Sequence, residues 1–145
     1  MKEIVGNLWR YYGRPNIVIC ITTNCFVKRD GSAVMGRGGA AEARSYVPGI
    51  AKMLGDHIRT NGELAGFLTP QVIAFPVKHV WYEKADLELI RSSAHWLGQI
   101  AAKRSQSNLF ILPRPGCGNG HLSYSDVRPI LVDLLPDNVY VIDFA

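Results

Sequence analysis

The sequence lacks the features that mark membrane, secreted and repetitive proteins. No apolar run approaches the roughly 20 residues that a membrane-spanning helix needs. No repeat or low-complexity tract is present. The first residues, MKEIVGNLWRYY, contain an early glutamate and no long apolar region, so we do not expect a signal peptide. We therefore expect a cytoplasmic protein with no membrane partner.

Cysteine is also scarce, which bears on disulfides and metals. Cys20, Cys25 and Cys117 are odd in number and form no CxxC pair, a usage that predicts reduced thiols. His79 and His121 add two further metal-ligating types, but no HxH, HxxxH or CxxC spacing accompanies them. The sequence therefore predicts no metal site and no cofactor.

The composition that is present fits one globular domain over residues 1–145. Hydrophobic residues make up 48% of the chain and charged residues 19%. The net charge of +4 suits an anionic ligand or nucleic acid, although many soluble proteins carry such an excess. One alternative is therefore a small basic nucleic-acid-binding protein, with a basic and aromatic patch made of Trp9, Arg10, Tyr11, Tyr12 and Arg14.

Two kinds of hydrophobic pattern alternate along the chain. Near-continuous β-branched or apolar runs predict buried strands, with a shorter candidate at the start, at residues 2–6, 16–23, 71–77, 108–113 and 138–144. Helical periodicity predicts helices at residues 49–60, 85–104 and 125–135. Pro129 predicts a late start for the last helix, with Ser123 or Ser125 as its N-cap. This alternation predicts an α/β fold with a sheet covered on both faces.

Polar and glycine-rich segments follow three of the predicted strands. In such folds ligands bind beyond the carboxyl ends of the strands. Residues 36–43, GRGGAAEA, and residues 116–120, GCGNG, each place glycines before a predicted helix start, where free N–H groups attract anions. Two such loops across one crevice would hold a diphosphate, although each alone is also typical of an ordinary turn. Neither the GxxxxGK[ST] pattern nor a GxGxxG after the first strand is present, which argues against a P-loop NTPase and a dinucleotide-binding domain.

Three stretches together carry a family resemblance: TNCFVKRDGSAVMGRGGA at residues 23–40, FPVKHVW at 75–81 and PRPGCGNGHLSYSDVRPIL at 113–131. In this order they resemble the macro domain family, which binds ADP-ribose, and the resemblance runs from about Glu3 to Asp143. Within this family, the sequence is similar to the branch that contains the DNA ADP-ribosyl glycohydrolase antitoxins and the glutamate-ADP-ribose hydrolases. The resemblance implies a three-layer α/β/α domain with a central mixed sheet of about six strands.

The resemblance also implies a ligand site. Asn7 would face the adenine with Leu8 lining the pocket, Phe144 would lie against the adenine, and Asn24 would face the distal ribose. One wall around the distal ribose and diphosphate would be formed by Met35, Gly36, Arg37, Gly38, Gly39 and Ala40. The other would be formed by Pro115, Gly116, Cys117, Gly118, Asn119, Gly120 and His121.

Lys78 is the residue that the resemblance places at the reaction. In this branch a lysine there attacks or holds the anomeric carbon of the distal ribose. An amine can form a Schiff base with a ring-opened sugar, and burial makes it a better nucleophile. By residue type alone, Lys78 is more typical of a solvated lysine at a strand end than of a catalytic one.

The sequence departs from its relatives at three places. Gly120 stands where the related eukaryotic hydrolases have an aspartate, although the antitoxin branch also has glycine there. Ile21 stands where the antitoxins have a further asparagine. Residues 25–33, CFVKRDGSA, resemble an insertion that either contacts the ribose and its attachment or forms a plain hairpin with Asp30-Gly31 at its turn.

We therefore predict that the chain binds ADP-ribose and removes it from modified DNA or protein, with Lys78 and Asn24 as catalytic residues. Two alternatives keep the pocket: a phosphatase for ADP-ribose 1″-phosphate, and a binding module without catalysis. Three side-chain roles stay open: His121 as an acid or base or a surface residue, Cys117 as a nucleophile or a small packed residue, and Trp81 with Tyr82 as a base-stacking pair or core and rim aromatics. The sequence does not indicate an oligomeric state.

Overall fold

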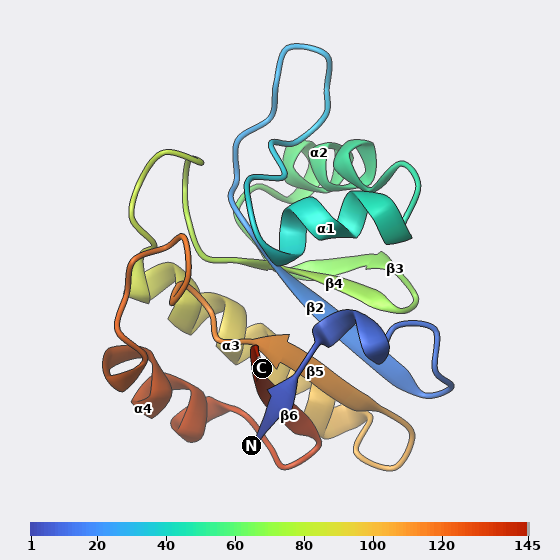
Figure 1. Cartoon of the computed structure of the whole chain (residues 1–145), viewed down its shortest axis with the longest axis vertical. Helices are drawn as coiled ribbons and strands as arrows, with labels where there is room; N and C mark the ends of the chain where they lie inside the picture. Colours follow the sequence, from blue (N-terminus) through green and yellow to red (C-terminus); the bar gives the residue numbers. More distant parts are fainter. Residues whose placement is uncertain (145) are drawn as a thin grey trace.

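A six-stranded sheet forms the centre of the computed structural model, which describes residues 1–144 (Figure 1). Its order is β1-β6-β5-β2-β4-β3. The strands are β1 (Lys2–Gly6), β2 (Ile17–Thr23), β3 (Gly66–Thr69), β4 (Val72–Pro76), β5 (Leu109–Pro113) and β6 (Val139–Phe144). Every neighbouring pair is parallel except β3 with β4, so the sheet is mixed.

The helices begin where short polar side chains or glycines allow the chain to turn. Asp86 accepts a hydrogen bond from the backbone N–H of Glu88, and Ser123 accepts one from that of Ser125, so both act as N-caps. The helices are α1 (Gly39–Tyr46), α2 (Ile50–Asn61), α3 (Leu87–Lys103) and α4 (Tyr124–Leu134), with a 3₁₀ turn, η1 (Leu8–Arg10). No helix within residues 1–144 is long and apolar enough to cross a membrane.

The core has two layers, one on each face of the sheet. Val18 and Cys20 of β2 pack with α3 and α4, whereas Ile19 and Ile21 pack with α1, α2 and η1. Because neighbouring side chains of a strand point to opposite faces, a strand buried on both faces is apolar throughout. The predicted three-layer α/β/α architecture with a mixed sheet is therefore confirmed.

The predicted strands are confirmed to within one residue at each end. The short strand β3 was not predicted, because four residues on a sheet edge give little pattern. The prediction that Pro129 delays the last helix was wrong, since α4 begins at Tyr124 and continues through Pro129. Pro129 lies just past the first turn, where it removes only the bond to the carbonyl of the exposed Ser125, which water can satisfy.

Residues 25–33 form a hairpin-like loop that projects beyond β2. Lys28 N–H donates to the carbonyl of Ser32 at 2.8 Å, and Gly31, with φ of 89°, donates to the carbonyl of Lys28 at 2.9 Å. Asp30 accepts from both the backbone and the hydroxyl of Ser32. This geometry agrees with the plain hairpin that the Asp-Gly pair predicts.

Candidate functional site

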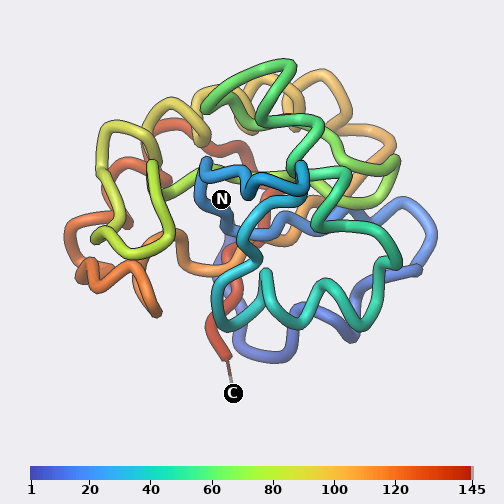
Figure 2. The backbone as a smooth tube through the Cα atoms, turned by 90° about the horizontal axis from the view of Figure 1, so that it is seen from above, coloured from blue at the N-terminus to red at the C-terminus, as the bar shows by residue number. Residues whose placement is uncertain are grey.

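The carboxyl ends of β2, β4 and β5 meet at one edge of the sheet, because these strands are neighbours and parallel. The segments that follow them line a cavity of about 930 Å³, a size typical of small-molecule sites. Figure 2 looks onto this end and shows all three: residues 25–38 in blue to cyan, 78–86 in yellow-green and 115–121 in orange. The end of β6 completes the lining.

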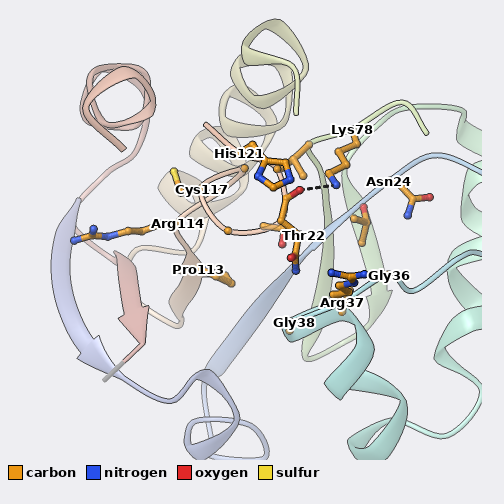
Figure 3. Close-up of a pocket in the computed structure, with 18 of the residues that line it drawn as sticks. Thr22, Asn24, Gly36, Arg37, Gly38, Lys78, Pro113, Arg114, Cys117 and His121 are labelled. Carbon is orange, nitrogen blue, oxygen red and sulfur yellow. Dashed lines mark hydrogen bonds between the residues drawn. The ribbon is translucent and has the colours of Figure 1, made fainter. Parts of the chain in front are cut away.

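Lys78 extends from the end of β4 toward the segment that follows β5 (Figure 3). Its Nζ donates to the carbonyl of Asn119 at 2.9 Å and to that of Trp81 at 3.4 Å. Partial burial, and then the positive charge of Arg37, lower the pKa of Lys78. No carboxylate among residues 1–144 forms a salt bridge with Lys78. The amine is therefore directed into the cavity by backbone oxygens alone.

Residues 116–121, which we call the glycine-rich segment, form a tight double turn against the start of α3. Gly116 has a φ of 74°, and a Cβ at Gly120 would lie 2.5 Å from the Gly116 carbonyl oxygen and 2.8 Å from Ala85 Cβ. Leu122 N–H donates to the Gly116 carbonyl, and Ala85 N–H donates to that of Gly120. Glycine is thus required at these two positions for the segment to pack. His121 has a φ of 62°, which strains a residue with a side chain.

A second glycine cluster lies on the opposite wall of the cavity, at the start of α1. Gly36 and Gly38 have φ values of 62° and 66°, and Gly38 is an N-cap with no side chain to satisfy the free N–H groups. A Cβ at Gly38 would lie 3.6 Å from Asn119 Nδ2, so the side chain of Asn119 reaches from one glycine cluster to the other. The uncapped helix start makes this wall suitable for an anion.

Asn24 ends β2 and holds the loop that follows. Its Nδ2 donates to the carbonyl of Val34 at 2.8 Å, and its Oδ1 accepts from Phe26 N–H at 3.0 Å. The residue is 7% exposed and lines the cavity. Asn24 thus clamps both ends of residues 26–34, while one amide hydrogen and one oxygen lone pair remain for a ligand.

Most of the residues that the sequence analysis assigned to the ligand lie together in this cavity. These are Asn24, Met35, Gly36, Arg37, Gly38, Gly39, Ala40, Lys78, Gly116, Cys117, Gly118, Asn119, Gly120, His121 and Phe144.

Asn7, Leu8 and Pro115 are not brought into the cavity lining. The side chain of Asn7 caps η1, with its Oδ1 accepting from Trp9 N–H at 2.9 Å. Leu8 is fully buried in the core layer under α1 and α2. Pro115 is buried beside the glycine-rich segment. The side-chain oxygen of Asn7 thus caps the turn, and its contact with the adenine stays a prediction.

Several lining residues were missed by the sequence analysis. Arg114 lies with its guanidinium 3.9 Å from the centre of the Tyr124 ring, and its Nη1 lies 3.6 Å from Asp143 Oδ2. Thr22 and Thr23 also line the cavity, and the Thr23 hydroxyl is buried without a partner. Thr22 and Thr23 directly precede Asn24, so their position at a strand end was the available signal.

The geometry gives little support to Cys117 as a nucleophile or to a metal site. Burial raises the pKa of the Cys117 thiol to about 11, so the thiol is protonated at neutral pH and is a weak nucleophile. Its Sγ donates to the carbonyl of Pro115 at 3.4 Å. Within the described residues, no three His, Cys, Asp or Glu side chains are grouped to hold a metal ion.

The aromatic residues divide into two groups. Trp81 and Tyr82, with 50% and 69% exposure, line the mouth of the cavity with ring centroids 5.3 Å apart. They are rim residues rather than core residues. Trp9, in contrast, is 4% exposed and stacks on Tyr46 with centroids 4.5 Å apart. Trp9 is therefore a core residue and does not contribute to the basic and aromatic surface patch that the sequence suggested as an alternative.

Neither a protein-family model nor a curated protein sequence matches the chain. Solved structures share its fold. The macrodomain of Mycobacterium tuberculosis DarG has a TM-score of 0.74 and 23% identity, and the match covers 99% of this chain and 98% of that one. A macrodomain protein from Streptomyces coelicolor has a TM-score of 0.67 and 18% identity, with 100% of both chains covered. The chain has the macrodomain fold.

The same macrodomain fold occurs in Thermosipho africanus DarTG in complex with ADP-ribose, with a TM-score of 0.73 and 20% identity. That match covers 100% of this chain and 42% of DarTG, so the chain spans less than half of the length of that protein. The macrodomain resemblance inferred from the three sequence motifs is thus confirmed at the level of the fold.

Proposed function

We propose that the chain binds ADP-ribose in this cavity and hydrolyses the bond between the distal ribose and a modified macromolecule. The observation that carries the proposal is the meeting of two glycine clusters across one cavity, with the Lys78 amine between them. Backbone N–H groups at both walls would hold the diphosphate, since bare backbone can approach its oxygens closely. The complex of DarTG with ADP-ribose supports this choice of ligand.

The geometry suggests which residues would bind each part of the ligand. The glycine-rich segment and residues 36–40 hold the diphosphate. Asn24 directs its remaining amide hydrogen and lone pair to the ribose hydroxyls, while its other two bonds fix the loop. Phe144, 53% exposed at the end of β6, offers an aromatic face to the adenine. Lys78 then reaches the anomeric carbon of the distal ribose.

Two chemical roles fit Lys78. As an ammonium ion, it donates a proton to the departing group while water attacks the anomeric carbon. As a neutral amine, which its lowered pKa favours, it attacks the anomeric carbon and displaces the macromolecule, which leaves with the proton that the amine loses. The ring of the resulting glycosylamine opens to an imine, and water hydrolyses the imine to free ADP-ribose and the regenerated amine. Both routes release free ADP-ribose and return the macromolecule with a proton in place of the sugar.

The proposal is tested by supplying the protein with a DNA oligonucleotide that carries ADP-ribose and with a protein modified on glutamate. Release of free ADP-ribose from one substrate supports the proposal and identifies the macromolecule. Tight ADP-ribose binding without release from either substrate would favour the non-catalytic binding module.

A phosphatase for ADP-ribose 1″-phosphate is the second candidate. Arg37 lies close enough to Lys78 to lower its pKa, so two positive charges share one end of the cavity. A terminal phosphate would be stabilised there. Release of inorganic phosphate from ADP-ribose 1″-phosphate, with no release of ADP-ribose from macromolecules, would support this candidate instead.

A further inference from the structure

Lys78 is followed by a histidine whose ring contacts two carboxylates from distant parts of the chain. His79 Nδ1 lies 2.6 Å from Glu63 Oε2, in the connection between α2 and β3. Its Nε2 lies 2.6 Å from Asp86 Oδ2, at the N-cap of α3. A neutral imidazole has one N–H donor and one acceptor lone pair. Both contacts can be hydrogen bonds only when the ring is protonated.

The charges around the ring agree with this state. The hydrogen bonds that the ring donates to Asp86 and then to Glu63 raise the pKa of His79, and the ring in turn lowers the pKa of Asp86. The remaining titratable group at the cluster is the Cys25 thiol, whose pKa is raised to about 12 by burial and by Glu63. The three bridging side chains are 39–48% exposed, so water screens them and their effect on global stability is small. Their effect is therefore local.

The contact between the His79 ring and Asp86 joins the two ends of residues 77–86, which we call the Lys78 segment. Asp86 N–H donates to the carbonyl of Val77 at 2.9 Å, beside the contact between the His79 ring and the Asp86 carboxylate. On its other side, the His79 carbonyl accepts from Cys25 N–H at 3.2 Å. One residue thus joins the segment to the loop after β2, to the α2–β3 connection and to α3.

Both acceptors of the Lys78 amine depend on this closed segment. Trp81, whose carbonyl accepts from Nζ, lies at its tip. Asn119, the other acceptor, belongs to the glycine-rich segment, which rests on the bond from Ala85 N–H to the Gly120 carbonyl at 3.0 Å. A change at the base of the Lys78 segment can therefore move both carbonyls that direct the amine.

We propose that His79 is a positioning residue: its protonated ring bridges Glu63 and Asp86, holds the Lys78 segment closed, and releases the anion-binding end of the cavity when it loses its proton. For its effect on ligand binding the proposal rests on the proposed function. The bridge exists while the carboxylates are ionised and the ring is protonated. ADP-ribose affinity should therefore fall as the pH rises through the raised pKa of His79.

The first test needs no ligand. In the free protein, ¹⁵N NMR of the imidazole rings should show both His79 nitrogens protonated at neutral pH. The indole N–H signal of Trp81 should shift with the same midpoint as the ring. A neutral His79 ring at neutral pH, or a Trp81 signal that does not follow its titration, would overturn the proposal.

The second test is calorimetric titration with ADP-ribose between pH 6 and 9. Wild-type affinity should fall about fivefold or more across the His79 titration. His79→Gln should bind at every pH as weakly as the wild type at high pH, and Glu63→Gln should weaken binding at low pH. His95→Gln, an exposed histidine of α3, is the matched control and should follow the wild type.

The comparison of variants isolates His79 from the other groups of the cavity. His121 also lines it, so any slope shared by the wild type and His79→Gln belongs to other residues. Equal affinity of these two proteins at every pH would overturn the proposal. No binding at any pH would instead refute the proposed function, and the ligand-free NMR test of the bridge would still decide the role of His79.

Discussion

The Lys78 amine and the Asn119 carbonyl, 2.9 Å apart, join the end of β4 to the glycine-rich segment. Through this bond the Lys78 amine is directed at the wall that would hold a phosphate. Asn119 also reaches Gly38 on the opposite wall. A ligand that takes the Lys78 amine must therefore displace the Asn119 carbonyl, which links ligand binding to the freeing of the lysine.

Substitution of Lys78 separates the two chemical roles proposed for it. Lys78→Ala should lower the rate of ADP-ribose release by about 100-fold or more with little change in affinity. Lys78→Arg keeps the charge but cannot form an imine, so it retains much of the rate only in the electrostatic role. Borohydride treatment during turnover should leave a mass adduct on the wild type only in the covalent role. Full activity in Lys78→Ala would refute both.

Two glycines of the same segment form a matched pair. Gly120→Ala should destabilise the protein by about 1–3 kcal/mol and weaken ADP-ribose binding, because its Cβ meets the Gly116 backbone and Ala85. Gly118→Ala has no atom within 4 Å of its Cβ and no positive φ, so its free energy of unfolding should stay within about 0.5 kcal/mol of the wild type. Urea denaturation measures both. Equal stability of the two variants would show that the packing of the segment is not as described.

Asn24 should matter for stability as well as for the ligand. Asn24→Ala removes both bonds that clamp residues 26–34 and should cost about 1–3 kcal/mol. Asn24→Asp keeps the acceptor for Phe26 N–H but loses the donor to the Val34 carbonyl. Its free energy of unfolding should therefore lie between those of the wild type and Asn24→Ala. Hydrogen exchange at Phe26 should rise in Asn24→Ala. Unchanged exchange there would mean that the loop is held by other contacts.

The acid side of the stability profile should depend on Glu3. Arg128 and then Tyr124 hydrogen-bond its carboxylate and lower its pKa. Such a group stabilises the fold above its unfolded pKa and loses that contribution as the pH falls through its folded pKa. Glu3→Gln should therefore be slightly less stable than the wild type at neutral pH, and the difference should vanish in acid. A difference that grows as the pH falls would contradict this pairing.

The sequence predicts the fold better than it predicts the site. Runs such as residues 17–23 are buried on both faces, so their apolar pattern alone marks the strand. The edge strand β3 pairs on one side only and carries no such pattern. At the site, Lys78 and the glycine-rich segment follow strands closely, and their place beyond the strand ends could be predicted from that rule.

Other parts of the site depend on contacts between residues far apart in the chain. Arg114 lies near Asp143 because β5 and β6 are neighbours, and His79 meets Glu63 because β4 and β3 are neighbours. Asn7 is a local case, since its side-chain oxygen caps η1, and the adenine contact that the motif assigned to it stays a prediction. Motifs therefore identify the segments of the site, and the sheet order decides which side chains meet.

Calorimetric titration of the wild type with free ADP-ribose measures the binding on which the proposed function depends. The two glycine clusters and the lysine between them predict binding of one ADP-ribose per chain with a Kd of about micromolar or below. The same titration with Gly120→Ala should show clearly weaker binding. An absence of heat and of saturable binding at high protein concentration would contradict the account, because the glycine clusters would then serve the fold alone.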